Sequence, residues 1–429
     1  MGRSTKHIYP MLCLILVLAG VLAVFHFNPS ILQSLPWLSP DEPPIIEQPD
    51  NPPDDNQNPP EQQPPVDEPP VDNPPEQNPP DDDPPVENPP VENPPVVDPP
   101  IDDPTDQPTV PQSIVTLTGY YYTYANMKSD LAELAERYPD TMSYRSYGIS
   151  ADGRDLYAAT LGNPNAPKQV IITSGMHARE YVNSFVVMRQ LEYYLENYDT
   201  VRYEGHLLRD LFEEVCFVIV PMTNPDGITL AQEGIDAIRN PALQQIIRSI
   251  CGSTNTKVIN DYLNTYWKSN ARGVDVNRNF DALWDEHNDI VGRPAAKNYK
   301  GASAMSEVET AYLVALTESL SNPVASVCVH SQGVIIYWRC FQQGGFEAEN
   351  KRLAQIAQKV TGYAIIDDNQ TEPSYSNWTI LAHGIPTITV ETGLGGYPQN
   401  HSTMASGIYD RNRDLWAAVA AAYAGLAKG

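Results

Sequence analysis

Basic residues are missing from a long stretch near the N-terminus. Residues 41–112 contain no Lys or Arg, yet they hold 26 of the 41 prolines and 20 acidic residues. A segment so strongly charged and so poor in apolar side chains cannot bury a core. A Pro-Pro pair recurs every five residues from Pro59 to Pro100, and proline favours the extended polyproline II conformation. We therefore expect residues 41–112 to form an acidic stalk, disordered or in polyproline II.

Positive charge is also scarce in the remainder of the chain. Residues 1–40 carry +2, the stalk carries −20 and residues 113–429 carry −9, which together give the net charge of −27. Binding to phosphate groups needs a basic face. The charge therefore predicts that nucleic acid is not a partner.

One long apolar run lies near the N-terminus. Met11–Phe27 has no charged residue and follows Arg3 and Lys6. The run is at the short edge for a membrane-spanning helix of about 20 residues and slightly long for a signal-peptide core of about 7–15. We favour an uncleaved signal anchor in residues 1–40, with cleavage near Val21–Ala23 as the alternative. Because positive charge precedes the run, the rest of the chain is expected on the extracellular face of the membrane, or secreted after cleavage.

Cysteine is too sparse for a cysteine-rich metal site. Of the five cysteines, four lie in residues 113–429, and none are clustered. Cys216 and Cys328 fall within apolar runs, where buried free thiols are expected. Cys251 and Cys340 lie near loop-like sequence and could pair, since disulfides are permitted outside the cell; this bond is the less favoured state.

Residues 113–429 alternate between patterns typical of strands and helices. Short apolar runs predict buried strands at 170–173, 215–220, 324–329 and 386–390, and a strand with a turn is expected over 147–154. Helical spacing is found over 124–138, capped at Ser129-Asp130, and over 182–194, 306–320 and 350–360. Asn224–Gly227 is typical of a turn. The alternation predicts an α/β domain with a mixed, largely parallel twisted sheet flanked by helices.

Candidate metal ligands and one further carboxylate follow the predicted strands. His177 and Glu180 come after one apolar run, His330 ends a second and Glu391 ends a third. The carboxyl ends of parallel strands share one edge of a sheet, where active sites form. Two histidines and a carboxylate leave zinc an open position, as catalytic zinc sites require. The pattern therefore predicts a zinc site built from the two histidines and one of the two carboxylates.

Four sequence blocks, in this order, resemble the zinc carboxypeptidases related to carboxypeptidases A and B. The resemblance covers residues 115–425 and is carried by His177–Glu180, Ala271–Phe280, Val329–Ser331 and Ile388–Glu391. It implies one Zn²⁺ per domain, bound by His177, Glu180 and His330.

The resemblance also implies roles around the metal. Glu391 matches the general base, and Arg272 matches the arginine that polarises the scissile carbonyl. Asn277 and Arg278 match the pair that grips the substrate's terminal carboxylate. Asp275 matches a carboxylate that orients a ligand histidine. Arg179 is either a further substrate contact or a solvated charge.

Two positions depart from the animal enzymes. The family usually has a substrate-contacting tyrosine in the stretch before the last strand, and Tyr375 is the sole tyrosine within 367–378. Ser376 falls at the position whose side chain, in the animal enzymes, selects the C-terminal residue that is released. A small polar residue there favours neither a large apolar nor a basic C-terminal residue.

An insertion at 228–266, together with 330–333 and 336–338, looks most like bacterial γ-D-glutamyl-diaminopimelate peptidases. The resemblance thus implies hydrolysis of a peptide or isopeptide bond next to a free carboxylate, with a peptidoglycan stem peptide as the preferred substrate. The alternatives are a general extracellular carboxypeptidase, a related amidohydrolase and a surface binding module.

Overall fold

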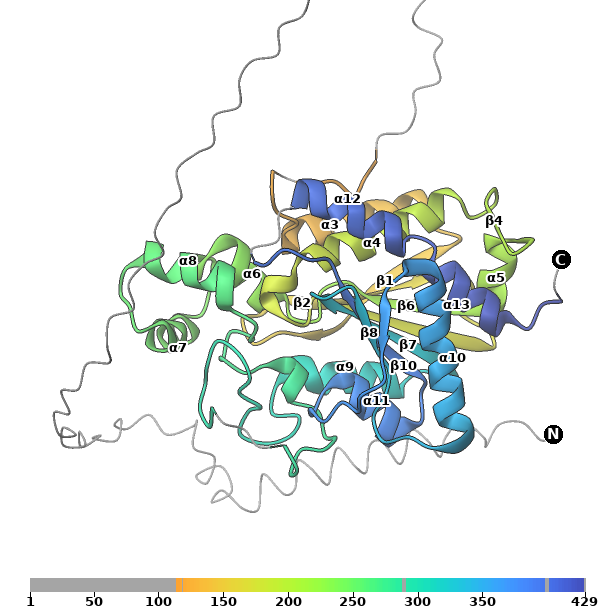
Figure 1. Ribbon diagram of the computed structural model, residues 1–429. Helices are drawn as coiled ribbons and strands as arrows, with labels where there is room; N and C mark the ends of the chain where they lie inside the picture. Colours follow the sequence, from red (N-terminus) through yellow and green to blue (C-terminus); the bar gives the residue numbers. More distant parts are fainter. Residues whose placement is uncertain (1–112, 118, 288–290, 398–400, 428–429) are drawn as a thin grey trace, which may run out of the picture. The chain divides into compact units, whose positions relative to one another are not determined.

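The computed structural model describes residues 113–117, 119–287, 291–397 and 401–427 (Figure 1). The expected anchor segment 1–40 and stalk 41–112 lie outside these residues. Within the part of the chain that is described, no helix is both long and apolar enough to cross a membrane.

The described residues form an eight-stranded mixed sheet with the order β1-β2-β6-β3-β7-β10-β8-β9. Its four central strands, β6, β3, β7 and β10, run parallel to one another. Strands β1 and β2 add antiparallel pairings on one side, and β8 pairs antiparallel with β10 on the other. The strands are β1 (Met142–Ile149), β2 (Asp155–Leu161), β3 (Lys168–Ser174), β6 (Val215–Val220), β7 (Pro323–Ser331), β8 (Ile335–Tyr337), β9 (Ala364–Ile366) and β10 (Thr387–Thr392). The predicted mixed, largely parallel sheet is confirmed.

The central strands are apolar on both faces because helices cover both. Along β3, Val170 and Ile172 join the larger apolar cluster, whereas Ile171 joins the smaller cluster on the opposite face. In β7, Val327 and Val329 alternate with Cys328 in the same way. This period of two places successive side chains on opposite faces. It explains why both strands read as continuous apolar runs in the sequence.

The helices form two layers around the sheet (Figure 1). One layer contains α3, α4 and α12, and α9 and α11 lie on the other side of the sheet. The helices are α3 (Tyr124–Arg137), α4 (Val182–Glu196), α5 (Leu208–Glu214), α6 (Pro225–Glu233), α7 (Pro241–Cys251), α8 (Thr256–Tyr266), α9 (Val308–Glu318), α10 (Gly344–Thr361), α11 (Tyr375–His383), α12 (His401–Asn412) and α13 (Leu415–Ala424). The insertion predicted at 228–266 thus folds as most of α6, a short 3-10 turn, α7 and α8.

Two local predictions need correction. Helix α3 is capped by Thr123, whose side chain accepts a hydrogen bond from the Asn126 amide, and not by Ser129-Asp130. Asn224 is the N-cap of α6 with proline at the first helical position, so Asn224–Gly227 starts a helix rather than a simple turn. The cysteines follow the favoured expectation, since Cys216 and Cys328 are buried free thiols and Cys251 and Cys340 are also free.

Candidate active site

The carboxyl ends of three parallel strands bring the site together. His330 lies near the end of β7, and Glu391 on β10 is directly opposite it in the register. His177 lies three residues after the end of β3, and Glu180 follows in a short 3-10 helix over Ala178–Glu180. This edge of the sheet is the one that the sequence pattern predicts.

The loop that carries His177 and Glu180 is fixed by its backbone. Gly175 has φ +63°, and a side chain there would meet Ser184 Oγ at 2.7 Å, so glycine lets the chain turn sharply after β3. The side chain of Asn224 donates to the carbonyl oxygens of Met176 and Ser269, both at 3.1 Å. Asn224 therefore ties the metal-type loop to the segment before Asp275. Sequence reasoning missed this contact, although an N-cap asparagine before proline is a recognisable helix start.

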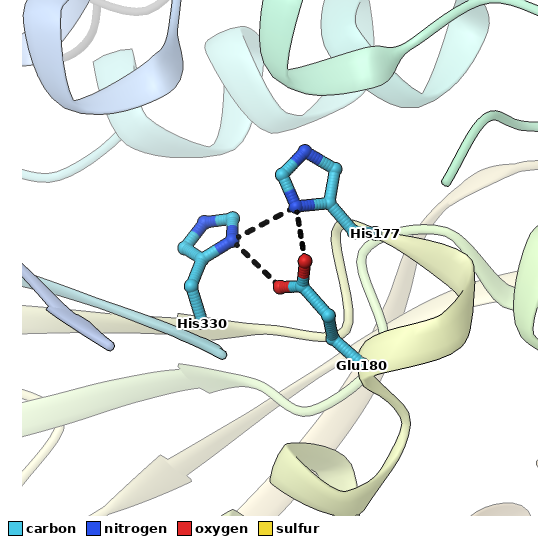
Figure 2. Close-up of side chains that lie close together, drawn as sticks. All are labelled: His177, Glu180 and His330. Carbon is cyan, nitrogen blue, oxygen red and sulfur yellow. Dashed lines mark hydrogen bonds and ion pairs between the residues drawn. The ribbon is translucent and has the colours of Figure 1, made fainter. Parts of the chain in front are cut away.

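Figure 2 shows the three candidate ligands converging. His177 Nδ1 lies 2.9 Å from Glu180 Oε1 and 3.2 Å from His330 Nδ1, and the latter lies 3.2 Å from Glu180 Oε2. All three side chains are buried. Two Nδ1 atoms this close cannot both carry a proton on the line between them. The group therefore presents lone pairs to one point, which fits a cation.

Carboxylates around the triad set its charge. His177 Nε2 lies 3.2 Å from Asp275 Oδ1. A proton on Nε2 directed at Asp275 leaves Nδ1 free to ligate, as is usual for metal-binding histidines. Burial acts against ionisation of Asp275, but His177, Arg278 and Lys268 together lower the pKa of this carboxyl. Burial likewise opposes ionisation of Glu180, yet His177 and Lys268 hold its pKa well below the usual range. Both carboxyls are thus anionic.

Glu391 has the opposite behaviour. Part of its side chain reaches solvent, but protein surrounds most of it. Burial and the negative charge of Glu180 raise the pKa of Glu391 to about 7, with His330 and Lys268 acting in the other direction. Glu180 and Glu391 thus lie at the same site, with pKa values shifted in opposite directions. Such a pair of carboxyls is expected at a site of proton transfer.

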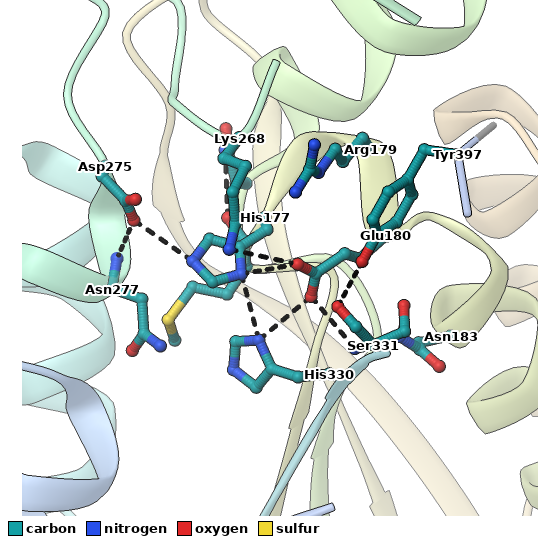
Figure 3. A network of polar contacts seen from close by, with 12 residues as sticks. His177, Arg179, Glu180, Asn183, Lys268, Asp275, Asn277, His330, Ser331 and Tyr397 are labelled. Carbon is teal, nitrogen blue, oxygen red and sulfur yellow. Dashed lines mark hydrogen bonds and ion pairs between the residues drawn. The ribbon is translucent and has the colours of Figure 1, made fainter. Parts of the chain in front are cut away.

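Lys268 is a charged residue at the candidate site that the sequence analysis did not identify. Its Nζ lies 3.5 Å from Glu180 Oε1, with 19% of the side chain exposed. The backbone places it there, because Ala178 N donates to Lys268 O and Arg179 N donates to Trp267 O. Figure 3 shows the Lys268 side chain directed at Glu180. Its position seven residues before Asp275, next to the buried Trp267, was the available signal.

Arg272 does not reach the triad in the same way. It is exposed, and its backbone amide donates to Asn270 Oδ1. Its side chain makes no hydrogen bond or ion pair with any residue that the structure describes. The positive charge beside Glu180 is that of Lys268, and the role expected of Arg272 stays a prediction.

Asn277, Arg278 and Ser376 lie together at the start of α11. Asn277 Oδ1 accepts a hydrogen bond from the Tyr375 amide at 3.2 Å. Arg278 is half-buried and lies 3.8 Å from Glu372. Ser376 is half-buried, with its hydroxyl 3.1 Å from that of Ser374. The structure thus brings three of the predicted substrate-binding residues into one region.

The prediction that Tyr375 contacts substrate is wrong. Tyr375 is fully buried, its hydroxyl pairs with Thr317 Oγ1 at 2.8 Å, and its ring packs between Phe280 and Trp378. It is a core residue of the smaller apolar cluster. A different tyrosine, Tyr397, lies at the site, where its hydroxyl donates to the Ser331 carbonyl oxygen.

Residues 127–408 match the zinc carboxypeptidase family (Peptidase M14), and the chain belongs to that family of hydrolases.

Among its relatives, a gamma-D-glutamyl-L-diamino acid endopeptidase 1 of Lysinibacillus sphaericus is 29% identical over 65% of this chain and 67% of its own. A carboxypeptidase B of Astacus astacus is 30% identical over 44% of this chain and 54% of its own. A solved carboxypeptidase A of Helicoverpa armigera, at 19% identity, shares the fold with a TM-score of 0.53, covering 74% of this chain and 76% of its own.

Proposed function

We propose that this zinc carboxypeptidase hydrolyses a peptide or isopeptide bond next to a free carboxylate, with a peptidoglycan stem peptide as substrate. The proposal rests on the grouping of candidate metal ligands, a proton-accepting carboxyl and cationic side chains at one edge of the sheet. The triad of His177, Glu180 and His330 is flanked by a carboxyl with a raised pKa, by a lysine and by the half-buried pair Asn277 and Arg278.

One Zn²⁺ per domain would be held by His177, Glu180 and His330. The family is zinc-dependent, and the convergence of two imidazole nitrogens with two carboxylate oxygens fits an ion of this kind. When bound, zinc acidifies a coordinated water and polarises a carbonyl group. Asp275 orients His177 for this task through the Nε2 side of the ring.

Glu391 acts as the general base. It lies opposite His330 on the neighbouring strand, and its pKa of about 7 suits a group that takes a proton at neutral pH and releases it to the departing amine. Its carboxyl faces the negative charge of Glu180, and this repulsion favours proton uptake.

Lys268 supplies the positive charge that stabilises the developing oxyanion, the role that sequence resemblance gives to Arg272. Its Nζ is already aimed at the triad and needs no rearrangement to act there. Arg272 is exposed on the turn between Lys268 and Asp275.

Asn277 and Arg278 bind the free carboxylate of the substrate. A guanidinium can hold a carboxylate by two parallel hydrogen bonds, which lysine cannot match. Arg278 meets Glu372 only at 3.8 Å, so an incoming carboxylate can displace a weak partner. Ser376, beside them, leaves room for a polar rather than a bulky apolar side chain.

Two observations favour a cell-wall substrate. The Lysinibacillus relative is named for cleavage next to a γ-D-glutamyl residue. The acidic proline-rich segment 41–112, with the apolar run 11–27 as a membrane anchor, would hold the domain at a distance from the extracellular face of the membrane. We expect the protein in the membrane fraction, and recovery in the medium alone would remove the anchor from this proposal.

The test uses the purified full-length protein, with and without a zinc chelator. Its substrates are a muropeptide stem and plain acyl-dipeptides with a free C-terminus. Chelator-sensitive cleavage that prefers the stem peptide is the expected result. Preference for the plain dipeptides would instead support a general carboxypeptidase, as the Astacus relative is named. Absence of cleavage on every substrate would favour a binding module and refute the enzyme.

A further inference from the structure

A second cation lies beside the triad with no carboxylate partner. Arg179 is half-buried, and its guanidinium carbon lies 4.0 Å from the centre of the Tyr397 ring. Its Nη1 donates to the Thr265 carbonyl oxygen at 3.3 Å, and its buried Nε has no partner. Across the residues that the structure describes, no carboxylate pairs with Arg179, whereas Lys268 and Arg278 each face one.

Arg179 and Tyr397 lie on the opposite side of His177 from Asn277. In Figure 3, Asp275 and Asn277 are on one side of His177, and Arg179 and Tyr397 are on the other, near Glu180. A substrate whose terminal carboxylate reaches Asn277 and Arg278 therefore extends its acyl portion towards Arg179.

The Arg179–Tyr397 pair is anchored to β7 rather than free to swing. The Tyr397 hydroxyl donates to the Ser331 carbonyl oxygen, and the Gly396 amide donates to Gln332 Oε1 at 2.9 Å. Gly333 N donates to Gly393 O at 3.1 Å. A guanidinium stacked on a fixed aromatic ring keeps its edge available for an anion.

We propose that Arg179, supported by Tyr397, binds a second carboxylate, located on the acyl side of the scissile bond. This rests on the proposed function and sharpens its substrate class. A γ-linked glutamyl residue is joined through its side chain and keeps a free α-carboxylate near the scissile carbonyl. An ordinary α-linked residue has a neutral amide there. The site thus binds one substrate carboxylate on each side of the scissile bond.

The test compares two γ-D-glutamyl dipeptides that differ only at the glutamyl α-position, one with a carboxylate and one with a carboxamide. For the wild-type enzyme, kcat/KM should favour the carboxylate by about tenfold to a hundredfold, the range for hydrogen bonds to charged groups. Arg179→Gln should bring this ratio close to one, and Arg179→Lys should give an intermediate ratio. Tyr397→Leu should also lower it.

Arg202→Gln is the matched control, because Arg202 is an exposed arginine on β4 (Arg202–Tyr203), whose side chain donates only to Gly205 O among the described residues. Its ratio should equal that of the wild type. Zinc content and the far-UV spectrum of each variant exclude unfolding as the cause. A ratio unaffected by Arg179→Gln, or an equal loss on both substrates, would overturn the second-carboxylate site while leaving the proposed function intact. If the wild-type enzyme cleaves neither dipeptide, both proposals fail.

Discussion

Removing the Lys268 ammonium group should abolish most of the catalytic rate without unfolding the site. Lys268→Met keeps the length of the side chain and deletes its charge. The backbone contacts that fix this segment, from Ala178 N to Lys268 O and from Arg179 N to Trp267 O, involve main-chain atoms that the substitution retains. The metal-type loop should therefore keep its conformation.

The size of the effect follows from the position of Nζ. Lys268 Nζ lies 3.5 Å from Glu180 Oε1. Opposite unit charges about 4 Å apart interact by ~4 kcal/mol at an effective dielectric constant of about 20. An oxyanion forming beside the triad would meet the ammonium group at a comparable distance. Since 19% of the lysine side chain is exposed, solvent screens part of this interaction. We expect a loss of about 3 kcal/mol, or a hundredfold to thousandfold fall in kcat.

The assay compares kcat and KM of Lys268→Met, Lys268→Arg and Arg272→Met on the same stem peptide, with zinc content measured on each preparation. Lys268→Arg should recover part of the rate because it retains a cation. Arg272→Met should change kcat by less than about threefold, in line with the small effect of most exposed residues. A large loss in Arg272→Met together with normal kcat in Lys268→Met would refute the assignment and restore the role that sequence resemblance gives to Arg272.

Three further predictions concern the metal, the base and the core. Zinc removal should eliminate activity and lower the unfolding temperature, and readdition should restore both, because an ion at 1,000 times its Kd stabilises the fold by ~4 kcal/mol; an unchanged melting curve would contradict this. Glu391→Gln should eliminate turnover but retain zinc, and residual wild-type activity would exclude Glu391 as the base. Burial, together with Asp226 and Glu307, raises the pKa of Glu309 to about 7. The folded state thus takes up this proton first, and stability should fall as pH rises from about 4.5 to about 7, by up to ~3 kcal/mol from this group. Denaturant titrations at pH 5 and pH 8 should show this loss in the wild type and not in Glu309→Gln.

Much of the fold was predictable because the central strands have to be apolar on both faces. Runs such as 170–173 and 215–220 fall inside β3 and β6, and the ligands placed at strand ends do meet at one edge of the sheet. Helix ends were less predictable. Thr123 caps α3 through a contact with Asn126, and a nearby serine-aspartate pair offers a similar local pattern.

The sequence alone could not show which tyrosine lies at the site, because the position of a residue in the chain does not indicate whether its side chain is buried. Tyr375 starts α11 and points into the apolar cluster with Phe280 and Trp378, where its hydroxyl finds Thr317. Tyr397 follows β10 in a loop that is hydrogen-bonded to the end of β7 and the segment after it. No short-range pattern reveals those contacts, since the two segments are about 65 residues apart in the chain.

The exposure of Arg272 has a more specific cause, a reversal of the chain between Lys268 and Asp275. Asn270 N donates to Val274 O at 2.8 Å, and Asn270 Oδ1 accepts from the amides of Arg272 and Val274. Gly273 completes the turn with φ +73°. The residues on either side of such a turn face the same way, so Lys268 and Asp275 both reach the triad, while Arg272 at the tip faces solvent. Arg272 lies between Lys268 and Asp275 in the sequence. Because of the turn, its side chain points away from the site that these two residues contact.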